Sequence, residues 1–532
     1  MSGGSHECDE RCGGPDDQAP LTGSSFGLLA VIVMAMLAGC TVGPDFTPPA
    51  SPAGRSLVPA GVSGAFVPGT RDRTQRLVAG GTVAPQWWRA FHNPQLNALE
   101  DEALRSSPTL DAAQATLAQA REAVAVARGG EFPQVDFAAA AERQKGPPFA
   151  LALLPSASQG LPVFNLYTLG PTVSFLPDAF GLTARSVEAQ QALAEVQGDQ
   201  LAAARLTVAG NVALQALTLA SLRSQIGVVQ TMVAGDRKNL ALVHAKRVAG
   251  RANRNDELTA QAQLASDRVL LSPLQAQRGA AEDALAVLAG QAPAGWSAPA
   301  FDLDRFVLPA QLPVSVPSVL VRQRPDILAA QAQLHARSAA IGVATAQMYP
   351  SFPLSASFGT AALATTALGT SRSLVWTLAG GLTMPIFHGG ALTAQRKEAV
   401  DGFHAALAVY RETVLEAFGQ VADILRALDA DAALVKAARQ SFDSAAAAAK
   451  LQDMALVAGR GNELERIAAE RNAGQARLGY IRAQAQREMD TVRLFVAMGG
   501  GRWQDAAWCP GCGQSTQAGL VQRDDPSSRG EK

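Results

Sequence analysis

Short segments in which apolar residues alternate with polar or small ones lie between much longer segments with helical periodicity. The alternation runs through residues 134–139, 354–359 and 374–379, and a further segment, 163–175, follows the first of these. A period of two predicts strands with one apolar and one polar face. The chain is therefore expected to contain four strands of about the ten-residue length that crosses a bilayer at a tilt.

Long helices are predicted for most of the remaining sequence. Residues 95–128, broken at Pro108, precede the first strand pair, and residues 325–347 precede the second. After each strand pair, apolar residues recur in steps of three and four, beginning at Leu219 and at Val414, as in a coiled-coil seam. The helix predicted over 185–246 would extend roughly 90 Å at about 1.5 Å per residue.

Each long helix is followed by a turn that contains glycine and asparagine. The first turn includes Gly250 and Arg251, and the second includes Gly459 and Arg460. Glycine and asparagine tolerate the left-handed backbone at a helix end. A helical hairpin therefore follows each strand pair.

The two halves of the chain share one layout. Pro108 and Pro325 open similar helical segments at an offset of 217 residues, whereas Gly250 and Gly459 correspond at an offset of 209. A fixed order of elements with one connection of different length indicates an internal structural repeat.

Four membrane strands pose a problem of closure. A sheet in lipid cannot leave the N–H and C=O groups of its edge strands unpaired, and the smallest usual barrels need about eight strands. The barrel must therefore be shared, with eight strands from two chains or twelve from three. The alternative is a pair of ordinary hairpins on a helical protein that does not cross a membrane.

Composition and residue types argue against nucleic-acid binding and against catalysis. The chain has 532 residues, only 17% of them charged, and a formal net charge of −1. Nucleic acid is therefore an unsuitable partner. No nucleophile, metal cluster or phosphate-binding loop stands out, and His335, His388 and His404 lack a metal-ligand spacing. An enzyme is disfavoured.

An apolar run, 26–37, precedes the sequence Leu-Ala-Gly-Cys that ends at Cys40. The run is too short to span a bilayer, and it resembles the signal sequence and lipobox of bacterial lipoproteins. This resemblance implies that Cys40 carries covalent lipid, and Thr41 after it implies sorting to the outer membrane. The acidic residues within 1–20 are unusual in a signal peptide and indicate that translation starts downstream.

These observations divide the chain into five segments. Residues 1–39 form a signal peptide, 40–84 a lipidated extended tether, 85–300 the first repeat, 301–503 the second repeat, and 504–532 a polar, disordered tail. The tail contains Cys509 and Cys512, which have the spacing of a redox or metal pair.

The order of several short motifs resembles the TolC-like outer membrane factors, and within them the NodT-type lipoprotein efflux channels. The resemblance covers Cys40 to about Trp503. The motifs are Val42-Gly43-Pro44-Asp45-Phe46, Trp87-Trp88, Arg324-Pro325-Asp326-Ile327, Ile341-Gly342, Tyr349-Pro350-Ser351 and Pro385-Ile386-Phe387 with Gly389-Gly390.

The resemblance implies a homotrimer in the outer membrane of a Gram-negative bacterium, with a twelve-stranded barrel continued by a periplasmic helical tunnel. It implies efflux of small molecules without a cofactor, and docking of the turns at Gly250, Arg251, Gly459 and Arg460 onto a periplasmic adaptor and an inner membrane RND pump. A type I secretion channel and a non-conducting trimeric coiled-coil scaffold remain as alternatives.

Residues near the turns are candidates for closing the periplasmic mouth. The resemblance places a gate leucine at Leu464, which has the alternative of a seam residue between helices. The acidic residue expected after it is absent, because the corresponding segment is Ile467-Ala468-Ala469-Glu470. Asp256 and Glu257 are candidates for a ring that favours cations, with the alternative of carboxylates that stabilise a helix start.

Overall fold

The computed structural model describes residues 41–50, 57–59, 67–68, 74–145 and 163–501. Cys40, the signal segment, Cys509 and Cys512 lie outside these residues. The chain divides into two compact units. We call residues 1–45, 125–189 and 338–400 the strand unit, and residues 46–124, 190–337 and 401–532 the helical unit.

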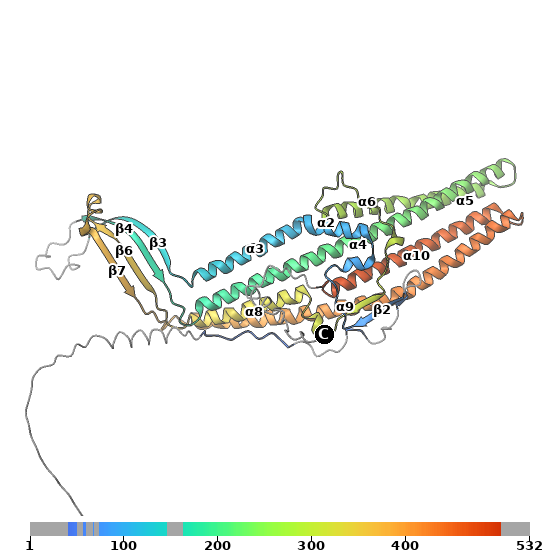
Figure 1. The fold of residues 1–532 in the computed structure, drawn as a ribbon. Coiled ribbons are helices and arrows are strands. Elements are labelled where there is room, and N and C mark those ends of the chain that lie inside the picture. Colours follow the sequence, from blue (N-terminus) through green and yellow to red (C-terminus); the bar gives the residue numbers. More distant parts are fainter. Residues whose placement is uncertain (1–40, 51–56, 60–66, 69–73, 146–162, 502–532) are drawn as a thin grey trace, which may run out of the picture. The chain divides into compact units, whose positions relative to one another are not determined.

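The strand unit contains one antiparallel sheet in the order β3-β4-β6-β7. The four strands lie side by side in Figure 1. Their bounds are β3 Gln134–Lys145, β4 Val163–Phe175, β6 Leu354–Ala362 and β7 Leu374–Gly380. All four strands were predicted, and β7 extends one residue beyond the alternation at 374–379.

Two features of this sheet matter for assembly. The β4–β6 ladder joins the two sequence halves, with Thr172 opposite Ser357. The outer strands β3 and β7 each have a single strand partner among the described residues. The sheet of one chain therefore has two open edges.

Long helices form most of the rest of the described chain. The helices are α2 Pro94–Ser106, α3 Pro108–Gly129, α4 Leu182–Val248, α5 Arg254–Val269, α6 Leu271–Leu288, α7 Pro317–Leu320, α8 Pro325–Ala346, α9 Ala391–Val457 and α10 Glu463–Ala497. In the helical unit, α5 and α6 return along α4, and α10 returns along α9 (Figure 1). Both predicted helical hairpins are present.

The return arms of the two hairpins differ from each other. The first arm is interrupted at Leu270, whereas the second arm, α10, is one helix of 35 residues. The interruption is explained by Pro273, which has no N–H for the carbonyl of Val269 and whose ring would clash with that carbonyl. Val269 is accordingly the last residue of α5.

Both hairpin turns use the same backbone geometry. Gly250 and Gly459 have positive φ angles of 73° and 69°. The N–H of the next residue then bonds a carbonyl five positions back, Arg251 to Lys246 at 2.7 Å and Arg460 to Ala455 at 2.9 Å. This is the Schellman arrangement, which satisfies carbonyls at a helix end and favours glycine.

The core of the helical unit contains a buried aromatic cluster. Trp87, Trp88 and Phe91 lie in the 3₁₀ helix η2 (Trp87–Phe91) and are at most 2% exposed. Trp87 stacks on Phe495 of α10 with ring centroids 5.7 Å apart. Helix α4 has an apolar 18-residue window that could span a membrane by composition, but 67% of it is buried within the protein, as in a core helix.

A small second sheet lies within the helical unit, in the order β1-β2-β5. Its strands are β1 Val67–Pro68, β2 Thr74–Ala79 and β5 Gln311–Val314, and β2 runs parallel to β5. Sequence analysis had treated residues before 85 as an extended tether and had not placed a strand there.

Strand β2 is attached to the helices by a buried polar contact. Gln75 Oε1 accepts hydrogen bonds from Nε of Arg487 at 3.0 Å and from Nη2 at 2.7 Å. Arg487 is fully buried and Gln75 is 1% exposed. Burial lowers the pKa of Arg487 to about 10, and nearby Asp431 opposes this shift.

We expect Gln75→Ala to lower the free energy of unfolding by about 2–3 kcal/mol, because a buried guanidinium loses its charged hydrogen bonds. Chemical denaturation of the purified protein measures this change. Gln311→Ala is the matched control, since Gln311 is an exposed residue of the neighbouring strand, and its effect should stay within about 0.5 kcal/mol. Equal unfolding midpoints for the two variants would contradict the structural role of the Gln75–Arg487 contact.

Candidate functional site

The strand register separates the side chains of the sheet into two faces, because directly opposed residues of an antiparallel pair lie on the same face. Val135 is opposite Val173, and Phe358 is opposite Trp376. The exposed apolar side chains on this face are Val135, Phe137, Val163, Leu169, Leu354, Phe358, Leu374, Trp376 and Leu378. We call it the apolar face.

The opposite surface, which we call the polar face, carries a continuous polar row across all four strands. Asp136 is opposite Thr172, Thr172 is opposite Ser357, and Ser357 is opposite Thr377. Alternation of this kind is typical of barrels that face lipid outside and water inside. The face assignments made from the sequence period agree with the register.

The segment that follows Cys40 is held against α4 within the strand unit. Arg185 of α4 donates to the backbone carbonyls of Val42 at 3.2 Å and Gly43 at 3.4 Å, and its Nη2 lies 2.7 Å from the Asp45 carboxylate. Gly43 lies so close to Gly342 that an added Cβ would be 2.5 Å from its Cα. These contacts explain why two sequence motifs, at 42–46 and 341–342, contain glycine.

At the first hairpin turn, both candidate acidic residues have local partners. Asp256 forms a capping box with Asn253 at the start of α5. Glu257 is 3% exposed and contacts His244 Nδ1 at 2.7 Å, Arg247 Nε at 2.8 Å and the guanidinium of Arg254. The hydrogen bond from His244, followed by those cations, lowers the pKa of Glu257. This placement agrees with the helix-start alternative in a single chain.

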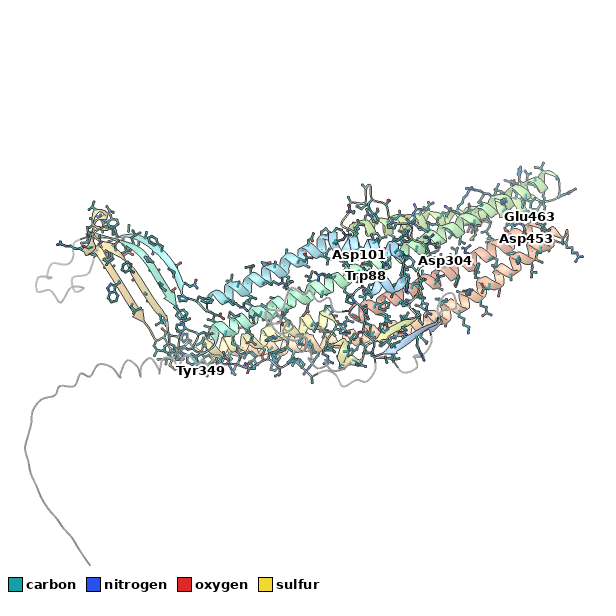
Figure 2. The ribbon with its side chains drawn as sticks, in the orientation of Figure 1. Trp88, Asp101, Asp304, Tyr349, Asp453 and Glu463 are labelled. Carbon is teal, nitrogen blue, oxygen red and sulfur yellow. The ribbon has the colours of Figure 1, made fainter. Side chains whose placement is uncertain are left out.

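At the second hairpin turn the charges are reversed: the central residue is basic and its partners are acidic. Arg466, which corresponds to Glu257 at the 209-residue offset, pairs with Glu463 at 2.6 Å and with Glu470. Arg466 lowers the pKa of Glu463. Asp453 and Glu463 lie beside this turn (Figure 2). Leu464 is half-buried within the single chain, and its N–H bonds the Asn462 side chain.

The turn residues expected to contact a partner protein are accessible. Gly250, Arg251, Gly459 and Arg460 are all exposed. The structure thus places them at the free ends of the two hairpins, while the docking role remains a prediction.

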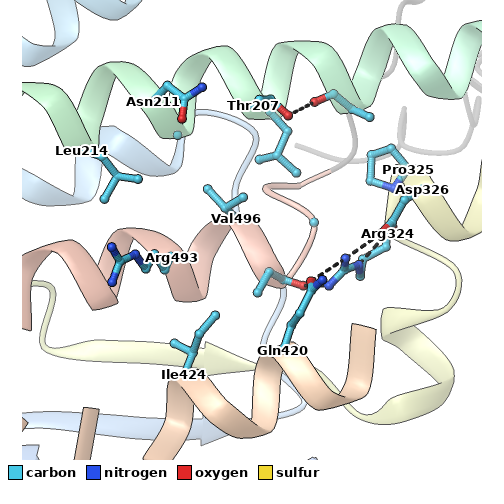
Figure 3. A pocket seen from close by; sticks show the side chains of 15 residues that line it. Thr207, Asn211, Leu214, Arg324, Pro325, Asp326, Gln420, Ile424, Arg493 and Val496 are labelled. Carbon is cyan, nitrogen blue, oxygen red and sulfur yellow. Dashed lines mark hydrogen bonds and ion pairs between the residues drawn. The ribbon is translucent and has the colours of Figure 1, made fainter. Parts of the chain in front are cut away.

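A pocket of about 390 Å³ surrounds the start of α8 (Figure 3). Arg324 lies on its wall, pairs with Asp326 at 2.6 Å, and donates to Gln420 Oε1 and to the carbonyl of Ala497, both at 3.0 Å. Pro325 is the first residue of α8. Arg324-Pro325-Asp326 therefore starts α8 and joins it to the interior of α9 and to the last residue of α10, rather than forming a charged binding site.

Two pairs of buried aspartates were not identified from the sequence. Burial, and then a hydrogen bond with Asp490, raises the pKa of Asp431 to about 7. Burial and a hydrogen bond with Asp267 raise the pKa of Asp236 to about 6. Only the contact between distant helices distinguishes these residues from the many exposed aspartates on coiled-coil surfaces.

The described residues contain no group of three or more His, Cys, Asp or Glu side chains that could hold a metal ion. The prominent functional features are instead the two-faced sheet, its open edges, and the paired helical hairpins. This combination is characteristic of a subunit that contributes strands and helices to a membrane channel.

Comparisons with known proteins agree with that class. The chain matches the family described as "Outer membrane efflux protein" over residues 99–291 and 316–500. It is 29% identical to outer membrane protein OprJ of Pseudomonas aeruginosa, covering 90% of this chain and 97% of OprJ. It is 25% identical to nodulation protein T of Rhizobium leguminosarum bv. viciae, covering 90% of this chain and 94% of that protein.

Among solved structures, the outer-membrane channel OprN superposes with a TM-score of 0.76 at 26% identity, covering 87% of this chain and 99% of OprN. The chain belongs to the outer membrane efflux protein family. It is an outer membrane channel protein of the TolC-like fold and not an enzyme, as the sequence had indicated. The separate matches to the two halves coincide with the internal repeat.

Trp376 and Thr377 provide a test of the two faces, because they are neighbours on β7 that point to opposite sides. We expect Trp376→Arg to cost about 2–4 kcal/mol if the residue lies near the bilayer midplane, and Thr377→Arg to cost much less. The fraction of each variant recovered as folded protein in the outer membrane measures the difference. Equal recovery would contradict the assignment of the apolar face to lipid.

Proposed function

We propose that three copies of this chain form a channel through the outer membrane and that this channel is the exit duct of a tripartite RND-type efflux system. The proposal is carried by the sheet with two open edges. Its unpaired β3 and β7 edges cannot remain in lipid, and pairing β7 of one copy with β3 of the next closes a barrel. Three copies supply twelve strands.

The exposed hairpin turns are the proposed contact with the periplasmic adaptor. Gly250, Arg251, Gly459 and Arg460 combine accessible backbone with two positive charges at the helix ends. Export against a concentration gradient requires an energy source, which an inner membrane pump supplies in this scheme. The adaptor then connects the pump to the hairpin turns.

We further propose that Cys40 is the lipidated N-terminus of the mature protein and that residues 1–39 are removed. The contacts of Arg185 with Val42, Gly43 and Asp45 support this proposal, because they fix the chain immediately after Cys40 to the strand unit. The segments 40–84, 85–300, 301–503 and 504–532 are then the tether, the two repeats and the tail.

The oligomer is tested with purified full-length protein. We expect a detergent-resistant trimer that gives stepwise conductance in planar bilayers, and loss of resistance to an exported compound when the gene is deleted. A monomer that stays soluble without detergent would contradict the shared barrel. A trimer without conductance would support the non-conducting scaffold instead.

Leu464 is proposed as part of the closed periplasmic mouth. Leu464→Ala is expected to raise the open probability severalfold, because truncation removes apolar contacts that would hold neighbouring hairpins together. Single-channel recording measures the open probability. Leu415→Ala is the control, since Leu415 is exposed on α9 far from the turn. An unchanged closed state would show that Leu464 is only a seam residue.

A further inference from the structure

The charged residues of the four strands are divided between the two faces of the sheet. Asp136 and Glu142 are the charged residues of the polar face among the described residues of β3, β4, β6 and β7. Both are carboxylates. The basic residues Arg143 and Lys145 occupy odd-numbered positions of β3 and therefore lie on the opposite face.

The register confirms this division at both levels. Asp136 is opposite Thr172 in the polar row, and Glu142 is opposite Leu166. Arg143 is opposite Asn165 and donates to its Oδ1 at 3.3 Å. Neither Asp136 nor Glu142 forms an ion pair with a described residue, so no cation in the described part of the chain neutralises their charges.

Three carboxylates near the hairpin turns differ in this respect, whereas Asp256 there has only its capping partner Asn253. Glu257 contacts three cationic or titratable side chains, and Glu463 and Glu470 both pair with Arg466. Local pairs of this kind cancel most of the field that a ring of acidic residues would exert on a passing ion. Asp136 and Glu142 have no cation paired with them among the described residues, so their field on a passing ion is not cancelled in this way.

We propose that Asp136 and Glu142 make the barrel selective for cations and cationic solutes. The inference rests on the proposed trimer, in which three copies would contribute six carboxylates as two rings. The rings would be separated by about 20 Å along the strand, given a rise of about 3.4 Å per residue. Rings of acidic side chains raise the local concentration of cations and lower that of anions.

The test uses purified full-length protein in planar bilayers under a KCl gradient. The reversal potential of the wild-type channel should be shifted from zero toward the equilibrium potential of K⁺. In Asp136→Asn with Glu142→Gln, which preserve shape and remove charge, the permeability ratio of K⁺ to Cl⁻ should fall by about twofold or more. The difference should be larger at about 0.1 M than at about 1 M salt, because the Debye length falls from ~10 to ~3 Å.

Arg143→Gln is the matched control, since it removes a charge from the adjacent position on the other face and should leave the ratio unchanged. Asp136→Lys provides an independent variant and should move selectivity toward anions. Each variant is recorded only after its trimer has been verified by gel in detergent. The same reversal potential in the wild type and the double neutral variant would overturn the assignment of selectivity to these rings. Failure of the wild type to conduct would instead overturn the proposed channel on which the inference rests.

Discussion

The hydrogen-bonding requirement of a strand edge in lipid determines the organisation of this protein. Water satisfies the edge of a sheet in a soluble protein, whereas hydrocarbon cannot. The N–H and C=O groups of β3 and β7 that point away from β4 and β6 therefore need partners from another strand. One chain provides a sheet of four strands with one face suited to lipid and the other to water. The folded subunit is therefore incomplete as a membrane structure, because the open edges of its sheet require strands from other copies.

The two halves of the internal repeat share the backbone geometry of the hairpin turn but differ in the charges beside it. Both hairpins reverse through a glycine in the left-handed region and restart with an asparagine cap. Near the start of the returning helix, however, Glu257 in the first hairpin occupies the position that Arg466 occupies in the second. Backbone geometry has been retained because few residues permit it, while the charge at the centre of each cluster has been inverted together with its partners.

Periodicity was sufficient to predict the strands, their faces and both helical hairpins, because each depends on a repeating local pattern. Prediction failed where the decisive partner is distant in sequence. The strand β2 is short and pairs with β5 more than 230 residues later, and Gln75 gains its role only from Arg487. The aspartate pairs and the cluster around Glu257 likewise depend on which helices meet. Pro273 was visible in the sequence, but its effect on the return helix was not recognised.

The interruption at Leu270 makes the two hairpins mechanically unequal. Hydrogen bonds run unbroken through α10, whereas between α5 and α6 the ladder loses the bond that Pro273 cannot donate. Bending at that joint therefore meets less resistance than bending anywhere along the continuous arm. In the proposed ring of three subunits, pliant and stiff arms would alternate, so that dilation would proceed with threefold symmetry although six similar hairpins would line the circumference.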